Sequence, residues 1–321
     1  MASTRAIVVV GGVPTKVGGT QLEQRRNWRS IVANFVSSLD CKESSRKLYT
    51  RTITQYFNWI QETGRDINLL TRVDILEYRD SLLSTGHSAL TTGSYIVAVR
   101  KFYEWAEAEK LYPNIAKGIK TPRRKNDFEK QHLSDEKSAE LLNHFQSLSL
   151  RDFAIVNLIL RTGLRTIEVV RADIGDITFR GEQRVLKVWG KGHTEKDDFV
   201  VLTEKAYQPI KEYLETRKGA KQGEPLFASN SRQNAGERLT TRTISKICKE
   251  GLQAIGLDGK EFTAHSLRHT AACAMLLHGA DLMAVQYSMR HTSPVTTEIY
   301  LKSLQKEQVV KNSYALLDEA F

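Results

Sequence analysis

Apolar residues recur at helical spacing over most of the first 110 residues. The first run starts near Leu22 and includes Trp28, Ile31, Val32, Phe35, Val36 and Leu39. A second run follows Ser44 and Ser45 and includes Tyr49, Ile53, Tyr56, Phe57 and Ile60. This period predicts amphipathic helices, and two more are predicted over about 71–83 and 88–109. Residues 21–117 are therefore expected to form a small helical domain, behind a flexible, glycine-containing leader at 1–20.

The pattern changes twice in the remainder of the chain. Residues 118–131 are rich in Lys and Arg, contain one proline and predict a linker. After it, Ser134 followed by two acids predicts a capped helix start, and the apolar stretch 151–160 predicts a buried helix. Period-two patterns over 176–179, 184–189 and 197–202 predict three antiparallel strands, with turns at 180–181 and 190–192. Helices are predicted from Glu204 to the end.

The predicted fold is therefore mainly α with a small antiparallel β-sheet, in two domains at 21–117 and 132–321. A length of 321 residues with 40% apolar residues is enough for two cores. The net charge of +10 is concentrated in residues 1–125, where 20 Lys and Arg face 11 Asp and Glu, leaving 27 against 26 for the rest. The N-terminal part is thus expected to meet a polyanion, with Arg123, Arg124 and Lys125 as contacts.

Several classes of protein are excluded by what the sequence contains. Cys41, Cys248 and Cys273 are far apart and in no CxxC pair, which argues against a disulfide framework or a thiolate metal site. The apolar run 6–10 is too short for an export signal or a bilayer span. We therefore expect a cytoplasmic protein with no membrane segment, no cofactor and no metal.

Three short fragments carry residues suited to chemistry. Thr162-Gly163-Leu164-Arg165 is followed by Glu168, one turn further on. His265 and Arg268 share one helix face at i, i+3, and His291 stands nine residues before Tyr300. Taken singly, each fragment also has a structural interpretation: a helix stop with a surface ion pair, or packing of an isolated His or Tyr.

Together, the fragments resemble the tyrosine recombinase (phage integrase) family in order and spacing. The matching segments are TGLR-x-x-E at 162–168, GKG at 190–192, H-x-L-R-H-T at 265–270 and H-x8-Y at 291–300. The basic helical segment is similar to that family's core-binding domain. The resemblance implies a site-specific recombinase or integrase of a mobile element, which cleaves and rejoins DNA through a 3′-phosphotyrosine. It also implies double-stranded DNA with two inverted half-sites as partner, with a dimer on each site and a tetramer in synapsis.

The resemblance implies a role for each matching residue. The catalytic set is Arg165, Lys191, His265, Arg268 and His291, with Glu168 as accessory acid and Tyr300 as nucleophile. The chemistry is consistent with this, because an arginine offers a fixed fork of donors to phosphate oxygens. Lys191, at the expected hairpin tip, would protonate the leaving 5′ oxygen, with Lys196 as the alternative. Where the family has Leu-Gly before the last histidine, this chain has Met289-Arg290.

Three other functions are compatible with parts of the sequence. His265 and His269 have the i, i+4 spacing of a zinc pair, but Ser266 stands where a zinc hydrolase needs glutamate. A catalytically silent DNA-binding protein on the same scaffold would have no need for all of these residues together: Arg165, Lys191, His265, Arg268, His291 and Tyr300. A type IB topoisomerase would share the chemistry without exchanging strands between sites.

The sequence after Tyr300 predicts a short amphipathic helix. Val310, Tyr314, Leu317 and Phe321 fall on one face of it. That face is expected to pack either on its own domain or on a neighbouring protomer.

Overall fold

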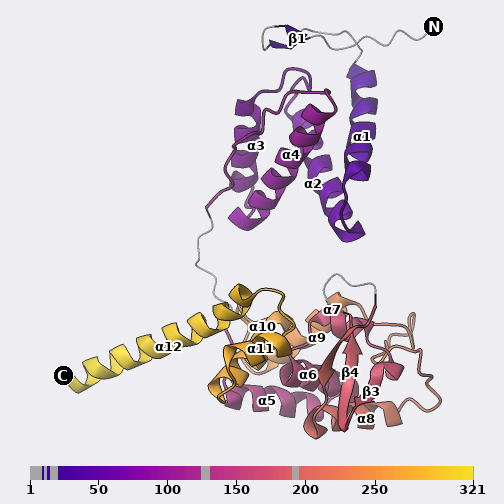
Figure 1. The fold of residues 1–321 in the computed structure, drawn as a ribbon, viewed down its shortest axis with the longest axis vertical. Helices are drawn as coiled ribbons and strands as arrows, with labels where there is room; N and C mark the ends of the chain where they lie inside the picture. Colours follow the sequence, from indigo (N-terminus) through magenta and orange to yellow (C-terminus); the bar gives the residue numbers. More distant parts are fainter. Residues whose placement is uncertain (1–8, 11–12, 15–20, 124–130, 190–194, 321) are drawn as a thin grey trace. The chain divides into compact units, whose positions relative to one another are not determined.

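The computed structural model describes residues 9–10, 13–14, 21–123, 131–189 and 195–320. The chain divides into two compact units, Met1–Asn126 and Asp127–Phe321 (Figure 1), which are described separately below. The predicted general acid Lys191, the predicted DNA contacts Arg124 and Lys125, and the turn at 190–192 lie outside the described residues. Within the predicted flexible leader, β1 (Val9–Val10) and β2 (Val13–Pro14) pair antiparallel, where the sequence predicted no regular structure.

The first unit contains the four predicted helices. They are α1 (Gln21–Ser38), α2 (Glu43–Glu62), α3 (Arg72–Ser84) and α4 (Ala89–Ala108). Aromatic rings dominate its core: Trp28 stacks on Phe57 with ring centroids 5.3 Å apart, and Phe35 meets Phe102 edge to face at 5.5 Å. Such rings bury large apolar areas, which stabilises a small domain. The helical period therefore predicted both the elements and their buried faces.

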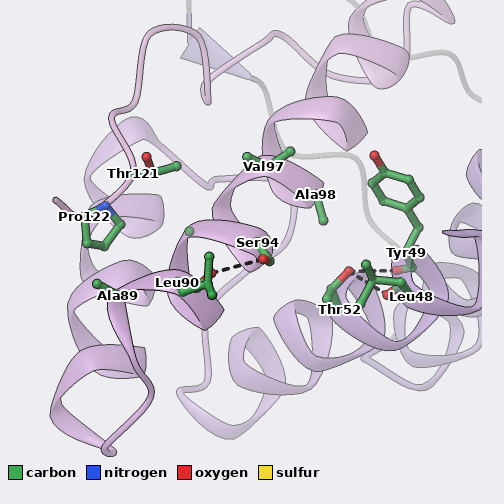
Figure 2. Close-up of a pocket in the computed structure, with 11 residues that line it drawn as sticks. Leu48, Tyr49, Thr52, Ala89, Leu90, Ser94, Val97, Ala98, Thr121 and Pro122 are labelled. Atoms are coloured by element: carbon green, nitrogen blue, oxygen red, sulfur yellow. Dashed lines mark hydrogen bonds between the residues drawn. The ribbon is translucent and has the colours of Figure 1, made fainter. Parts of the chain in front are cut away.

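One hollow of about 280 Å³ lies on this unit, between α2, α4 and the segment that follows α4. Figure 2 shows its lining, which is mostly aliphatic, with Leu48, Leu90, Val97 and Pro122 among the labelled side chains. The hydroxyl of Ser94 donates to the carbonyl of Leu90 within the same helix. The hollow is lined by no Lys, Arg or His.

Eight helices are described in the second unit, around a larger core. They are α5 (Asp135–Gln146), α6 (Leu150–Thr162), α7 (Thr166–Arg171), α8 (Glu204–Glu215), α9 (Thr241–Ala254), α10 (Ala264–Leu277), α11 (Leu282–Ser288) and α12 (Pro294–Ala320). Ser134 caps α5 by accepting the N–H of Lys137, as predicted. Helix α6 packs against α5, α8 and α10, so its middle is buried on every side.

A three-stranded antiparallel sheet follows α7 and a 3₁₀ turn at Ile174–Asp176. Its strands are β3 (Ile177–Arg180), β4 (Gln183–Val188) and β5 (Asp198–Val201), with β4 in the centre. Gly181, at φ 60°, supplies the left-handed residue in the β3–β4 turn. Fold class and strand order agree with the sequence prediction.

The helices of the second unit differ from the sequence prediction in two details. The helices predicted from Glu204 begin there with α8, and residues 216–240 then form an irregular connection between α8 and α9. Gly219, Gly223, Pro225 and Gly236 interrupt the helical period there. Tyr300 and the C-terminal residues also share one continuous helix, α12, instead of a separate short helix after Tyr300. None of the described helices is both long and apolar enough to cross a membrane.

Candidate active site

Four segments that lie far apart in sequence meet in the second unit. They are the α6–α7 junction, α10, the loop between α11 and α12, and α12 itself. Hydrogen bonds and ring contacts between these segments connect five side chains: Arg165, Glu168, Arg268, His291 and Tyr300. Five residues predicted from the sequence are thus brought together.

Gly163 forms the junction between α6 and α7. It ends α6 with φ 63°, a left-handed conformation that favours glycine. A Cβ at this position would overlap the thioether of Met289, which packs directly above it. The turn therefore favours glycine here, and a larger residue would also push aside the end of the Met289 side chain.

Arg268 is the best-buried cation of the cluster, with 2% of its surface exposed. Its guanidinium donates to the carbonyls of Gly163 and Met289, and one of its nitrogens lies 3.1 Å from Nε2 of His291. Burial, together with the charge of Arg165, lowers the pKa of Arg268 to about 10. The group is still a cation at neutral pH, and it is held by backbone carbonyls that fix its direction.

Glu168 accepts hydrogen bonds from two arginines at once. Its Oε1 lies 2.7 Å from Nη1 of Arg165, and its Oε2 lies 2.8 Å from Nη2 of Arg290. The backbone N–H of Arg165 also donates to Oε2, which closes the first turn of α7. Burial alone would raise the pKa of Glu168, but the charge of Arg290 and the contacts of Arg165 outweigh it and lower the pKa. Glu168 is 5% exposed, so the surface ion pair considered above does not describe it.

Arg290 is the residue whose importance the sequence did not reveal. Its backbone has φ 53°, in the left-handed region that glycine adopts freely and other residues rarely do. Its carbonyl accepts from Arg165 at 3.4 Å, while its own side chain turns inward to Glu168. The Met289-Arg290 pair in the sequence was a signal of something unusual, but the partner of Arg290 stands 122 residues earlier.

His291 is held in one tautomer. A guanidinium can only donate, so Nε2 accepts from Arg268 and the proton sits on Nδ1, which donates to the hydroxyl of Thr297 at 2.9 Å. Burial and the surrounding positive charges of Arg268 and Arg165 lower the pKa of His291 to about 4. The imidazole is therefore neutral at neutral pH. Thr297, which is fully buried, is a second supporting residue that the sequence did not identify.

Tyr300 lies in α12 between two imidazoles. Its ring is stacked on that of His291 at 5.7 Å and tilted against that of His269 at 4.9 Å. Burial raises the pKa of its hydroxyl, an effect that the charge of Arg268 opposes. The side chain is 5% exposed, whereas Tyr287 and Tyr314 are 74% and 66% exposed. Only Tyr300 of these three tyrosines stands beside the arginines.

The two histidines of α10 point to different surroundings. His265 is exposed in the first turn of the helix, and its positive form contributes to lowering the pKa of His291. His269 is buried and meets Tyr300, Cys273 and His132. The structure therefore groups His269 with Tyr300, Cys273 and His132, and not with His265 as a zinc hydrolase would need.

Lys196, the alternative to Lys191 in the sequence analysis, is anchored by two ion pairs. Its ammonium binds the carboxylates of Asp173, at 2.6 Å, and of Asp176. Burial by itself lowers the pKa of Lys196, but these two partners outweigh it and raise the pKa. Arg238 binds Asp173 as well, which completes an ion cluster beside the sheet.

The cluster carries an excess of positive charge. Arg165, Arg268 and Arg290 are balanced by one carboxylate, that of Glu168. Such an arrangement binds anions with oxygens that accept from several guanidinium donors. Of the predicted DNA contacts, Arg123 is described and is exposed at the end of the first unit.

Comparison with known families and sequences gives matches over both units. Residues 131–307 match the family described as "Phage integrase family", and residues 35–110 match "Phage integrase, N-terminal SAM-like domain". The tyrosine recombinase XerD of Proteus mirabilis is 30% identical over 285 residues, covering 85% of this chain and 83% of that protein. The tyrosine recombinase XerC of Pelobacter propionicus is 33% identical over 258 residues, covering 78% and 82%.

Solved structures with a similar fold are also recombinases. A XerH site-specific recombinase bound to a palindromic difH substrate, in a post-cleavage complex, has a TM-score of 0.69 at 21% identity and covers 85% of this chain and 80% of that one. A lambda integrase dimer bound to a core site has a TM-score of 0.63 at 17% identity, with coverages of 87% and 97%. At these identities the likeness concerns the fold.

Proposed function

This chain belongs to the phage integrase family and is a tyrosine recombinase, and from that premise we propose that Tyr300 attacks a DNA phosphodiester. The observation that carries the proposal is the burial of Tyr300 beside His291 and next to the Arg268 guanidinium. A cluster with one phenol and an excess of fixed positive charge suits attack on a phosphate anion. The product is a 3′-phosphotyrosine and a free 5′ hydroxyl.

Arg165 and Arg268 bind the non-bridging phosphate oxygens in this proposal. Both guanidinium groups are fixed before DNA arrives, by Glu168 and by the carbonyls of Gly163 and Met289. Donors that are already oriented stabilise the transition state without reorganisation, and one such donor is worth about 3–4 kcal/mol. Glu168 and Arg290 act as positioning residues, because they contact Arg165 and not the phosphate.

The histidines complete the donor set. His265 is exposed at the N-terminal end of α10, where its imidazole is accessible to a phosphate oxygen. His291 is neutral and its Nε2 accepts from the Arg268 guanidinium, so it helps to hold that arginine in the orientation that meets the phosphate. A phosphate anion nearby also favours the protonated imidazole, which then donates to the phosphate.

Lys191 is proposed as the general acid that protonates the leaving 5′ oxygen. The attachment of Lys196 to Asp173 and Asp176 supports this choice, because an anchored lysine is poorly suited to follow a leaving group. The phenol of Tyr300 releases its proton to solvent, Lys191 gives one proton to the 5′ oxygen and the Lys191 amine then takes one back from solvent, so protons balance. The phosphodiester energy is kept in the phosphotyrosine bond, and rejoining is the reverse attack by a 5′ hydroxyl.

The partner is double-stranded DNA, which the excess charge of the N-terminal part and the exposed Arg123 support. We propose that two inverted half-sites each take one protomer, giving a dimer on a site and a tetramer in synapsis. The linker residues Arg124 and Lys125 are proposed to contact the phosphates together with Arg123. In this proposal, strand cleavage and rejoining take place in the cytoplasm, on the DNA of a mobile element or its host.

A nicked suicide substrate tests this function. Wild type is expected to trap a 3′-phosphotyrosyl adduct and release a 5′ hydroxyl without added metal or ATP. Tyr300→Phe is expected to bind the same DNA and trap no adduct, while Tyr287→Phe, which changes an exposed tyrosine, traps a normal amount. Peptide mapping of the adduct to another residue would contradict the proposal.

The same preparation separates the alternative functions. A recombinase exchanges strands between two sites, a type IB topoisomerase relaxes one supercoiled duplex, and a silent binding protein forms no adduct. Strand exchange that requires two copies of the site is the expected outcome.

A further inference from the structure

A second cluster of side chains, suited to binding a metal ion, lies next to Tyr300. His132, His269 and Cys273 each offer one nitrogen or sulfur atom, and these atoms all lie within 4.8 Å of one another. None of the three has a role in the cleavage proposed above. No local sequence pattern predicts this cluster, because His132 stands 137 positions before His269 in a different segment.

The fold holds the three ligating residues in place. His269 and Cys273 are one turn apart on α10, and Sγ of Cys273 lies 3.7 Å from Nε2 of His269. His132 precedes α5, and its neighbour Leu133 donates its backbone N–H to the hydroxyl of Thr270 at 2.9 Å. This hydrogen bond ties the His132 segment to the middle of α10.

The distances suit a tetrahedral metal ion. With Zn–S near 2.3 Å and Zn–N near 2.0 Å, a sulfur and a nitrogen on one zinc ion are separated by about 3.5 Å. The sulfur to nitrogen distance of 3.7 Å is close to that value, and the ligating atoms of all three residues lie within 4.8 Å of one another. His132 is half-buried, whereas His269 and Cys273 are buried.

We propose that His132, His269 and Cys273 form a zinc site, with the fourth position open to water. One thiolate and two imidazoles are a donor set that selects Zn²⁺ over Mg²⁺ and Ca²⁺. Binding displaces the thiol proton of Cys273 to solvent, so the bound thiolate offsets half of the charge of the ion. Arg268 is next to His269 in sequence, but its guanidinium is directed to the carbonyls of Gly163 and Met289.

The proposed zinc site is linked to Tyr300 by the side chain of His269. The centroid of the His269 ring lies 4.9 Å from that of the Tyr300 ring, so a metal ion bound to His269 also fixes a ring that contacts the nucleophile. This zinc ion is not a catalytic metal, because the cleavage steps are assigned to other side chains. Its presence is independent of whether Tyr300 attacks DNA.

Metal binding to the full-length protein tests the site directly. Cobalt(II) titration is expected to give an absorption band from thiolate-to-metal charge transfer, which zinc then removes by competition. Cys273→Ser and His132→Gln are each expected to weaken zinc binding by at least about 100-fold, more than the loss of an outer-shell partner. Cys248→Ser is the matched control, since Cys248 is also fully buried and burial raises the pKa of its thiol to about 12.

The thiolate band of the cobalt-loaded protein distinguishes the possible outcomes. A thiolate band that is present in wild type and Cys248→Ser and absent in Cys273→Ser and His132→Gln supports the site, provided that all four proteins show the same unfolding transition in EDTA. A wild type without this band, or a band that survives in Cys273→Ser, overturns the proposal. Adduct formation by Tyr300 is measured separately, so failure of one proposal is distinguishable from failure of the other.

Discussion

The guanidinium of Arg290 and the carboxylate of Glu168 form an ion pair of 2.8 Å in which both side chains are almost fully buried, at 6% and 5% exposure. The pair joins the start of α7 to the loop before α12. Because Glu168 also binds Arg165, the conformation of that loop is coupled to the orientation of the arginine that we propose binds phosphate.

Removing Arg290 is expected to destabilise the fold and change the titration of the site. Arg290→Ala leaves a buried carboxylate with one arginine instead of two, which should lower the free energy of unfolding by about 3 kcal/mol. The pKa of Glu168 should rise, because the Arg290 charge lowers it. The acidic limb of the cleavage rate should therefore move to higher pH, as measured by single-turnover adduct formation.

Arg290→Gly separates charge from backbone strain. Glycine adopts φ 53° freely, whereas alanine does not, so the glycine variant should be more stable than the alanine variant by about 1 kcal/mol. Both variants lack the cation and should show the same shift in the pH profile. Equal stability of the two would contradict the strained backbone assigned to Arg290.

Stability should depend on pH through His291. The folded pKa of about 4 lies below the ordinary value of 6.5, so the unfolded chain binds a proton that the folded chain does not. The free energy of unfolding should then fall as pH drops from about 6.5 to about 4. His291→Gln should reduce the proton uptake on unfolding by up to about one in this window, as measured by urea unfolding at a series of pH values. An unchanged slope would contradict the buried neutral imidazole.

Gly163→Ala should destabilise the second unit for two reasons. The added Cβ overlaps the Met289 side chain, and alanine is strained at φ 63°. Together these should cost about 2–4 kcal/mol in the free energy of unfolding. Gly181→Ala is the control, because its φ is 60° and nothing lies within 4 Å of the added Cβ. If Gly163→Ala loses no more free energy of unfolding than Gly181→Ala does, the Met289 side chain moves aside at little cost.

The local elements were predictable because helical and strand periods are local properties. The four N-terminal helices, the Ser134 cap and the three strands all follow from neighbouring residues. The motif residues Arg165, Arg268, His291 and Tyr300 were found by their order along the chain. Periodicity failed at 216–240, where glycine and proline break it, and after Tyr300, where no stop signal separates two helices.

The supporting contacts were not predictable, because they join distant segments. No local pattern pairs Glu168 with Arg290, or brings His132 to Cys273. The sequence left Lys196 as the alternative to Lys191, because the carboxylates that hold Lys196 come from Asp173 and Asp176, before β3. Contacts of this kind depend on the completed fold.

DNA affinity should fall steeply with salt concentration. If the protein neutralises about 6–10 phosphates, binding should weaken by roughly 10³ or more between low and moderate salt. Arg123→Gln should reduce the slope of log affinity against log salt by about 0.9, whereas Arg123→Lys keeps the charge and should keep the slope. Fluorescence anisotropy with a labelled duplex measures both. A flat response in wild type would contradict phosphate binding by the N-terminal part.

Deletion of residues 306–321 should impair assembly and leave binding to one half-site intact. Val309, Val310 and Tyr314 on α12 are exposed at 62%, 46% and 66%, so these three described residues do not pack on their own unit. An exposed apolar face on a terminal helix is suited to a neighbouring protomer. Val310→Asp with Tyr314→Asp tests the face without shortening the chain, and should have the same effect. Gel-shift analysis distinguishes half-site complexes from dimers and synaptic tetramers. Normal multimer formation by both proteins would mean that protomers are linked through another surface.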